Sequence, residues 1–406
     1  MTDTRVFRRR VYHIGGYDPA SPAVVHGRFV KELRRFERSW AASATVSELV
    51  VGPDMATWQI QASGPNWRTE TAFHLLRWDD VIAQGRTARI WRRLPSGLAA
   101  FLDFLLAGAF TGYLRTSWRY AMFFLYPLVI FALIVLLAWM AGIGIARAAD
   151  SRLIGILAGV GVGGLAFHAA ERWLHLGLLF DDWIFARQYI RHGDALIADR
   201  LRRVATEIAE ARRTDPDEEI VIVGHSLGAV LAIDMIDCAL ASGLDGQDGR
   251  GRLAFLSVGA SILKIGLHRA ATRFRDAVSR VGAARGVFWA DYRARSDVMN
   301  FYGGDPMRQM GLPVTGSPLI RNVSIRRMIA PARYPRIRRN WYRMHCQFVR
   351  GNDRPAPYDY FMFICGPVAA ERLAASALGA MDFFDAEGRL SDSAQPAKTG
   401  EAALKP

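Results

Sequence analysis

Cysteine is scarce in this chain of 406 residues, and the scarcity limits the class of protein. Its three cysteines, Cys238, Cys346 and Cys365, are an odd number in apolar surroundings, and no metal-ligand spacing joins them. This usage is typical of a reducing compartment and excludes a disulfide-stapled secreted domain. We expect neither a metal nor a cofactor.

Charged residues are absent from two long stretches in the first half of the chain. Residues 120–146 hold no Asp, Glu, Lys or Arg in 27 positions, which exceeds the roughly 20 residues that a helix needs to cross a bilayer. Residues 153–170 are also uncharged, and their Gly155, Gly159 and Gly163 follow the small-xxx-small pattern of closely packed membrane helices. The two stretches predict a transmembrane helical hairpin.

An apolar leader is lacking among the first ten residues, which are polar and basic, so we expect no secretory signal. The loop between the two spans is short and carries Arg147 and Arg152 against Asp150. Counts of Lys and Arg in short loops favour a multi-pass membrane protein of two helices, with its catalytic domain facing the cytoplasm.

Acids are outnumbered by bases, and the formal net charge is +14. Residues 321–354 contain ten arginines and the single acid Asp353. We favour contact of this segment with anionic lipid headgroups of the bilayer. A solvated arginine face is the next interpretation, and nucleic acid is not the expected partner. The oligomeric state is not readable from the sequence.

Gly224-His225-Ser226-Leu227-Gly228 is the most informative motif in the chain. A β-branched run precedes it at 220–223, and an Ala/Leu/Ile/Met pattern typical of a buried helix follows it at 229–235. This is the order strand, tight turn, helix. Ser226 is therefore predicted at a sharp turn, where the flanking glycines allow close approach of the backbone.

These residues resemble the nucleophile elbow of α/β-hydrolases, and within that family of serine lipases and esterases with a G-H-S-L-G motif. The resemblance covers about residues 5–380, interrupted at about 97–187. It implies a mostly parallel sheet with helices on both faces, into which the membrane hairpin is inserted. The family order is serine, acid, histidine, and His345 is the only histidine after residue 297.

The resemblance implies Ser226 as nucleophile, Asp297 as acid and His345 as base. Asp297-Val298 lies just past an expected strand and is similar to the family's Asp-x-Val pattern, with the middle residue missing. Asp291, inside that strand, is the second candidate acid, and Asp305 lies in a Gly-Gly-Asp-Pro turn. His225 is interpreted as structural.

The oxyanion hole needs two backbone N–H donors. The elbow implies Leu227 as one donor. An early apolar strand that runs into His13-Ile14-Gly15-Gly16-Tyr17 resembles the lipase His-Gly-Gly loop with Ile14 inserted, so either Gly16 or Tyr17 is the second. A G-x-G-x-x-G match at 159–164 lies within the second apolar stretch, and no βαβ context supports a dinucleotide site.

The expected domain organisation is a hydrolase domain in two parts, 1–96 and 188–385, with a membrane-associated insertion at 97–187 and a disordered tail at 386–406. Residues 98–114 are interpreted as a buried helix or, alternatively, as a helix in the membrane interface. The other expected elements are helices at 22–40, 184–212 and 263–281 and strands at 45–51, 58–63, 71–78, 253–262 and 286–292.

The sequence thus predicts a membrane-anchored serine hydrolase that cleaves an ester, such as a lipid or another amphiphilic acyl ester, through an acyl-enzyme. Two alternatives stay open. One is an acyltransferase that uses the same triad, and the other is a catalytically idle membrane scaffold on a hydrolase fold. Acyl-chain length, headgroup preference and physiological role are not encoded in a readable motif.

Overall fold

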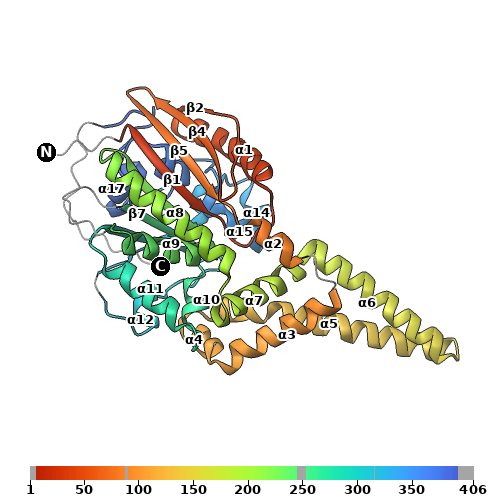
Figure 1. Cartoon of the computed structure of the whole chain (residues 1–406). Helices are drawn as coiled ribbons and strands as arrows, with labels where there is room; N and C mark the ends of the chain where they lie inside the picture. The colour runs from red at the N-terminus through yellow and green to blue at the C-terminus, as the bar shows by residue number, and fades with distance from the viewer. Residues whose placement is uncertain (1–5, 87–89, 245–252, 315, 392–406) are drawn as a thin grey trace.

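A computed structural model describes residues 6–86, 90–244, 253–314 and 316–391. These residues form a mixed α/β structure around a nine-stranded sheet, from which a long helical hairpin projects (Figure 1). The strands are β1 (Arg8–Ile14), β2 (Ser43–Val46), β3 (Val50–Val51), β4 (Met55–Gly64), β5 (Trp67–Leu76), β6 (Glu219–His225), β7 (Leu253–Val258), β8 (Val287–Ala294) and β9 (Leu319–Val323).

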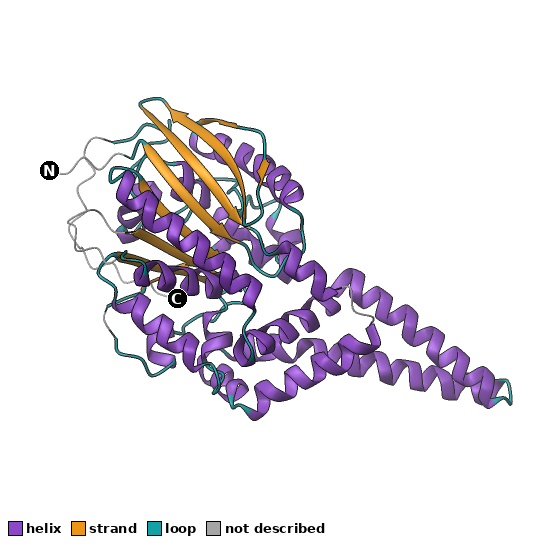
Figure 2. Cartoon of the chain, in the orientation of Figure 1, coloured by secondary structure: helices purple, strands orange, loops and turns teal. Residues whose placement is uncertain are grey.

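Helices lie between the strands in the chain and cover the sheet (Figure 2). The longer ones are α1 (Pro22–Trp40), α2 (Asp79–Arg86), α3 (Ile90–Leu106), α4 (Ala109–Thr116), α5 (Trp118–Ala148), α6 (Arg152–Leu174), α7 (Leu176–Arg191), α8 (Ala195–Thr214), α9 (Gly228–Ala241) and α11 (Thr272–Ala283). The short ones are α10 (Ile262–Gly266), α12 (Pro306–Gln309), α13 (Ile325–Met328), α14 (Tyr334–Ile337), α15 (Trp341–His345), α16 (Tyr360–Cys365), α17 (Ala370–Ala375) and the 3₁₀ turns η1 (Cys346–Val349) and η2 (Gly379–Asp382).

The sheet is parallel from β5 through β9, in the order β5-β1-β6-β7-β8-β9, and β4 and β2 extend it as antiparallel strands. β1 pairs with β6 although more than 200 residues separate them, and His13 lies beside Val223 in the register. The carboxyl ends of the parallel strands therefore meet at one edge of the sheet, where ligands bind in open α/β sheets.

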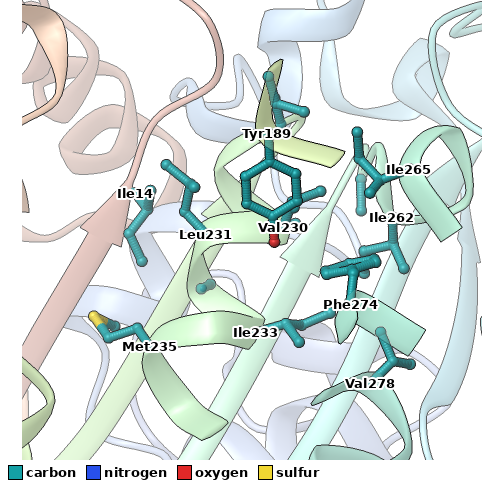
Figure 3. Packing of buried hydrophobic residues seen from close by; sticks show 14 of the residues in the cluster. Ile14, Tyr189, Val230, Leu231, Ile233, Met235, Ile262, Ile265, Phe274 and Val278 are labelled. Carbon is teal, nitrogen blue, oxygen red and sulfur yellow. The ribbon is translucent and has the colours of Figure 1, made fainter. Parts of the chain in front are cut away.

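The two faces of the sheet bury separate apolar clusters. Alternate residues of β6 point to opposite sides, with Ile220 and Ile222 in one cluster and Val221 and Val223 in the other. The first cluster is built around α9, whose neighbours in Figure 3 come from β1, α7, α10 and α11. A strand buried on both faces explains why its sequence is a continuous apolar run without alternation.

α5 and α6 are the two described helices that are long and apolar enough to cross a membrane. They run side by side away from the sheet (Figure 1). Their backbones approach closely at the small residues: a side-chain carbon on Gly155 would lie 2.6 Å from the carbonyl oxygen of Gly142, and one on Gly159 would lie 2.8 Å from that of Ala138. The packing explains the glycine spacing.

The segment at 98–114 is a pair of helices, α3 and α4, bent by 69° at their junction. Phe101 and Phe104 are buried, as the buried-helix interpretation expects, whereas Leu102 and Leu106 are 53% and 81% exposed. Asp103 is the one charged residue of this stretch, and its carboxylate accepts two hydrogen bonds from Arg191 of α7.

Several expected elements differ from the structure. The helix expected at 184–212 is broken between α7 and α8, where Gly193 has a φ of 69°. The helix expected at 263–281 is divided into α10 and α11, and the strand at 45–51 into β2 and β3. Residues 386–391 do not continue as an unpaired tail, since Leu390 is buried and forms a β-bridge with Phe384. Residues 392–406 lie outside the described residues.

A substitution in α6 tests the close approach of the hairpin helices. Gly155→Val should lower the free energy of unfolding in detergent by about 1–3 kcal/mol, because the new side chain collides with Gly142 and Ala146. Gly161→Val is the matched control, since it carries the same helix-propensity cost where no atom lies within 4 Å. Equal melting temperatures for the two variants would contradict the observed interface.

Candidate active site

The turn between β6 and α9 holds Ser226 in the left-handed region, with a φ of 55°. A non-glycine residue rarely adopts this conformation, and it persists only where the surroundings enforce it. The Ser226 N–H donates to the Val258 carbonyl oxygen at 3.1 Å, and its own carbonyl accepts from Ala229 and Ser261 at 3.2 and 3.0 Å. These three bonds fix the backbone of the turn.

The two glycines of the motif let this turn close. A side-chain carbon on Gly224 would lie 2.5 Å from the Cα of Ala229, and one on Gly228 would lie 2.2 Å from the carbonyl oxygen of Ile14. Both of these atoms belong to the backbone, which has little room to move away from a new side chain. The turn is thus wedged between its own helix and the end of β1.

His345 and Asp297 form a buried hydrogen-bonded pair. The two atoms His345 Nδ1 and Asp297 Oδ2 are 2.8 Å apart, and the residues are only 2% and 1% exposed. Because the Asp297 carboxylate can only accept, the proton lies on Nδ1. Asp297 also accepts from the Met299 N–H at 2.9 Å, and Asn300 donates to the Asp297 carbonyl oxygen.

The other ring nitrogen of His345 is available for chemistry. Among the described residues, Nε2 is buried without a hydrogen-bond partner. His345 and Ser226 line the same cavity, and the Ser226 Oγ lies 3.5 Å from the Ser261 Oγ. The structure therefore brings all three predicted triad residues to one edge of the sheet, from the loops after β6 and β8 and from the end of α15.

The other two candidate acids lie in different roles. Asp291 is on β8 and accepts hydrogen bonds of 2.5 Å from both Ser257 and Arg293. Asp305 caps the first turn of α12, where it accepts from the Met307 N–H at 2.9 Å. The carboxylate that pairs with His345 is that of Asp297, and the contacts of Asp291 and Asp305 described above are with other residues.

His225 packs against His345 and forms a hydrogen bond with its backbone. Its ring centroid lies 4.7 Å from that of His345, and its Nε2–H donates to the His345 carbonyl oxygen at 3.3 Å. Burial, together with the charge of His345, holds the pKa of His225 well below its usual range. A neutral ring at this position packs against the base and positions its backbone. Sequence reasoning assigned His225 a structural role but did not identify this contact.

The loop after β1 passes directly over Ser226. A side-chain carbon on Gly16 would lie 2.9 Å from the Ser226 Cβ, so only glycine fits there. Trp78 holds the loop by donating to the Gly15 carbonyl oxygen at 3.2 Å, and the Asp18 N–H donates to that of Gly16 at 2.8 Å. The structure thus places Gly16 against the serine.

The two other predicted oxyanion residues lie close by. Tyr17 lines the same cavity, and its ring packs against Trp78 and Phe185. Leu227 follows Ser226 directly and is 1% exposed at the start of α9. Gly16, Tyr17 and Leu227 therefore lie around Ser226, where an oxyanion hole would need its backbone N–H donors.

His13 forms part of the cavity wall at the end of β1. Its Nδ1 lies 3.1 Å from the Tyr360 hydroxyl, and its ring stacks on Phe73. Burial lowers the pKa of His13 to about 4, so the ring is neutral at physiological pH. It contributes bulk and polarity to the wall without adding charge.

The cavity around Ser226 has a volume of about 570 Å³, within the ordinary range for small-molecule sites. Its walls come from both parts of the sheet-forming chain and from the base of the hairpin. Tyr120 and Phe123 of α5 and Leu178 and Leu179 of α7 form an apolar side. No local pattern in the sequence predicted that residues of α5 would line this cavity.

A buried ion pair also lines this cavity. Lys264 of α10 is 2% exposed and donates to the carboxylate of Asp182 on α7. Tyr113 donates to the Lys264 carbonyl oxygen at 2.6 Å and holds the short helix. No sequence motif linked Lys264 to Asp182, because 82 residues separate them.

No metal site is suggested by the part of the chain that the structure describes, where no group of three or more His, Cys, Asp or Glu residues could hold an ion. The cysteines are free, and burial raises the pKa of the cavity-lining Cys346 to about 11, which keeps its thiol protonated. Acid–base chemistry at Ser226 needs neither a metal ion nor a cysteine thiol.

The chain was compared with protein families, curated proteins and solved structures. No protein-family model, no curated protein and no solved structure matches this chain.

Proposed function

We propose that this protein is a membrane-anchored serine hydrolase that cleaves an acyl ester, on an α/β-hydrolase fold. The observation that carries the proposal is the arrangement of Ser226 in a left-handed turn with the His345–Asp297 pair in the same cavity. Strained backbone of this kind is a pointer to function. The two other candidate acids are used in structural contacts.

The fold assignment within this proposal rests on chain order. The serine follows the central strand β6, the acid follows β8, and the histidine comes later in the chain, as in α/β-hydrolases. The antiparallel strands β2 and β4 extend the sheet at one edge of its parallel part, and helices cover both faces. These features are compatible with the family, while the inserted hairpin departs from its common form.

The proposed reaction begins with attack of Ser226 Oγ on the carbonyl carbon of the ester. His345 Nε2 accepts the hydroxyl proton, and Asp297 stabilises the imidazolium through Nδ1–H. The negative oxygen of the tetrahedral intermediate is stabilised by backbone N–H groups near Gly16 and Leu227. The leaving alcohol takes the proton from His345 and departs, which leaves an acyl-enzyme.

Water then attacks the acyl-enzyme with His345 again as base, and the carboxylic acid and Ser226 are released. The unpaired state of Nε2 is suited to this cycle, since the nitrogen is free to bind a proton at each stage. Each oxyanion donor is expected to contribute a factor of roughly 10²–10³ in rate.

Substitution of the triad tests the reaction. Ser226→Ala should abolish labelling by a fluorophosphonate probe and lower ester turnover by roughly 10³-fold or more, while the melting temperature is kept. His345→Ala should cost as much as Ser226→Ala, because the two act as a unit. Asp297→Asn should leave more residual activity than either.

Asp305→Asn is the control for the acid, since Asp305 only caps α12. Turnover by this variant should equal that of the unchanged protein. Undiminished labelling of Ser226→Ala would refute the nucleophile. Loss of activity in a folded Asp291→Asn variant, with Asp297→Asn active, would overturn the assignment of the acid.

We also propose that α5 and α6 span the membrane and that the sheet faces the cytoplasm. The proposal rests on the length and apolarity of the two helices and on the arginine-rich segment beside the sheet. An even number of crossings returns the chain to one side. This is needed because β1 precedes the hairpin and its partner β6 follows it.

Cysteine accessibility in sealed cells tests this orientation. In a background without the three native cysteines, Ser151→Cys between α5 and α6 should react with an impermeant maleimide added outside. Thr214→Cys and Ala386→Cys, both exposed on the body of the protein, should react only after permeabilisation. External labelling of Thr214→Cys would refute the cytoplasmic orientation.

A further inference from the structure

Positive charge exceeds negative charge in the wall of the cavity around Ser226. Seven Lys or Arg residues and four Asp or Glu residues line it. Each of the four acids already has a basic partner within 4.0 Å. The pairs are Asp18–Arg28, Glu32–Arg35, Asp79–Arg77 and Asp182–Lys264.

Three cations of the wall are left over. Arg333 is paired with Asp353, but Lys31, Arg343 and Arg350 have no carboxylate within 4.0 Å among the described residues. Lys31 and Arg343 are exposed, and Arg350 is half-buried. Like charges that line one cavity repel one another, and a bound anion reduces that repulsion.

Arg350 is the one half-buried member of this cluster, and its charge acts on other groups of the cavity wall. Its charge opposes the burial that raises the pKa of Cys346, the residue that follows His345. Its charge also adds to the burial that lowers the pKa of Arg35, as does the charge of Arg333. Arg343 lies on α15, which ends at His345, and Arg350 directly follows η1.

The same cavity has an apolar side that continues into the hairpin. Phe123 of α5 packs its ring at 5.1 Å from that of Trp341, and both residues line the cavity with Leu178. The arrangement offers an apolar wall at the base of the hairpin and cations at His345. An amphiphile with an anionic end has the complementary distribution of apolar surface and charge.

We propose that the substrate is an acyl ester bearing a phosphate headgroup, which Arg350, Arg343 and Lys31 bind while its acyl chain lies against Phe123, Trp341 and Leu178. A phosphate fits this set because it offers several oxygens and up to two charges, which arginine forks bind with two parallel hydrogen bonds. The source of the phosphate is a lipid of the bilayer. This inference rests on the proposed function for the ester bond only.

Binding measured without turnover tests the headgroup site. The full chain with Ser226→Ala, in micelles of a neutral detergent, is titrated with an ether-linked hexadecyl glycerol phosphate and with the matching uncharged hexadecyl glycerol. Neither ligand has an ester, so the readout does not depend on catalysis. The phosphate ligand should bind at least roughly 10-fold more tightly than the uncharged one.

Arg350→Gln should weaken binding of the phosphate ligand roughly 10-fold and leave the uncharged ligand unchanged. Arg350→Lys should restore part of the affinity, which also shows that the glutamine variant fails by loss of charge and not by misfolding. Arg339→Gln is the matched control, because Arg339 is an exposed arginine of the same segment that does not line the cavity. It should change neither affinity.

Equal affinities for the two ligands, or an equal loss of both in Arg350→Gln, would overturn the proposal. Inorganic phosphate is added as a competitor. If it displaces the phosphate ligand at the same concentrations at which that ligand saturates the protein, the site binds free phosphate and the lipid source is overturned. Fluorophosphonate labelling of the unchanged protein is measured in parallel. Absent labelling with intact phosphate preference would refute the hydrolase and leave the headgroup site standing.

Discussion

The crowding of backbone around Ser226 is the constraint on which the rest of the structure depends. Gly228 packs against the carbonyl oxygen of Ile14, and Gly16 packs against the serine itself. The loop after β1 and the turn after β6 can therefore exist only together. Because β1 and β6 lie on either side of the α5–α6 hairpin in the sequence, this contact also joins the two parts of the chain.

That joint explains how a long insertion is tolerated within a single sheet. The chain leaves the sheet after β5, forms α2 to α7, and returns through α8 to the strand beside β1. α8 packs on α9 and carries buried residues into the same cluster as β6. The insertion therefore begins and ends in the apolar layer that covers one face of the sheet, and its base becomes part of that layer.

The parts of this arrangement that the sequence predicts are those with local signals. The two long apolar helices follow from the length of their uncharged stretches, and the turn at Ser226 follows from glycines between a β-branched run and a helix. The pairing of His345 with Asp297 was predicted because no other histidine follows residue 297. In the structure, His345 Nδ1 and Asp297 Oδ2 lie 2.8 Å apart. Its catalytic meaning stays a prediction.

The parts that sequence reasoning missed depend on contacts between distant residues. β9 was not expected, because it is an edge strand of mixed exposure and lacks an apolar run. The break between α7 and α8 was missed because apolar residues continue on both sides of Gly193. The Lys264–Asp182 pair has no local pattern, because its two residues lie 82 positions apart on different helices.

If α5 spans the membrane as proposed, its entry into the cavity wall links the cavity to the thickness of the bilayer. Tyr120 and Phe123 occupy the first turns of the same helix that continues to Ala148, with no break along its length. Helices that are long for the local hydrocarbon thickness tilt to remain covered. In the proposed membrane orientation, a tilt of α5 would displace these two rings, and the shape of the cavity would then vary with the lipid composition around the protein.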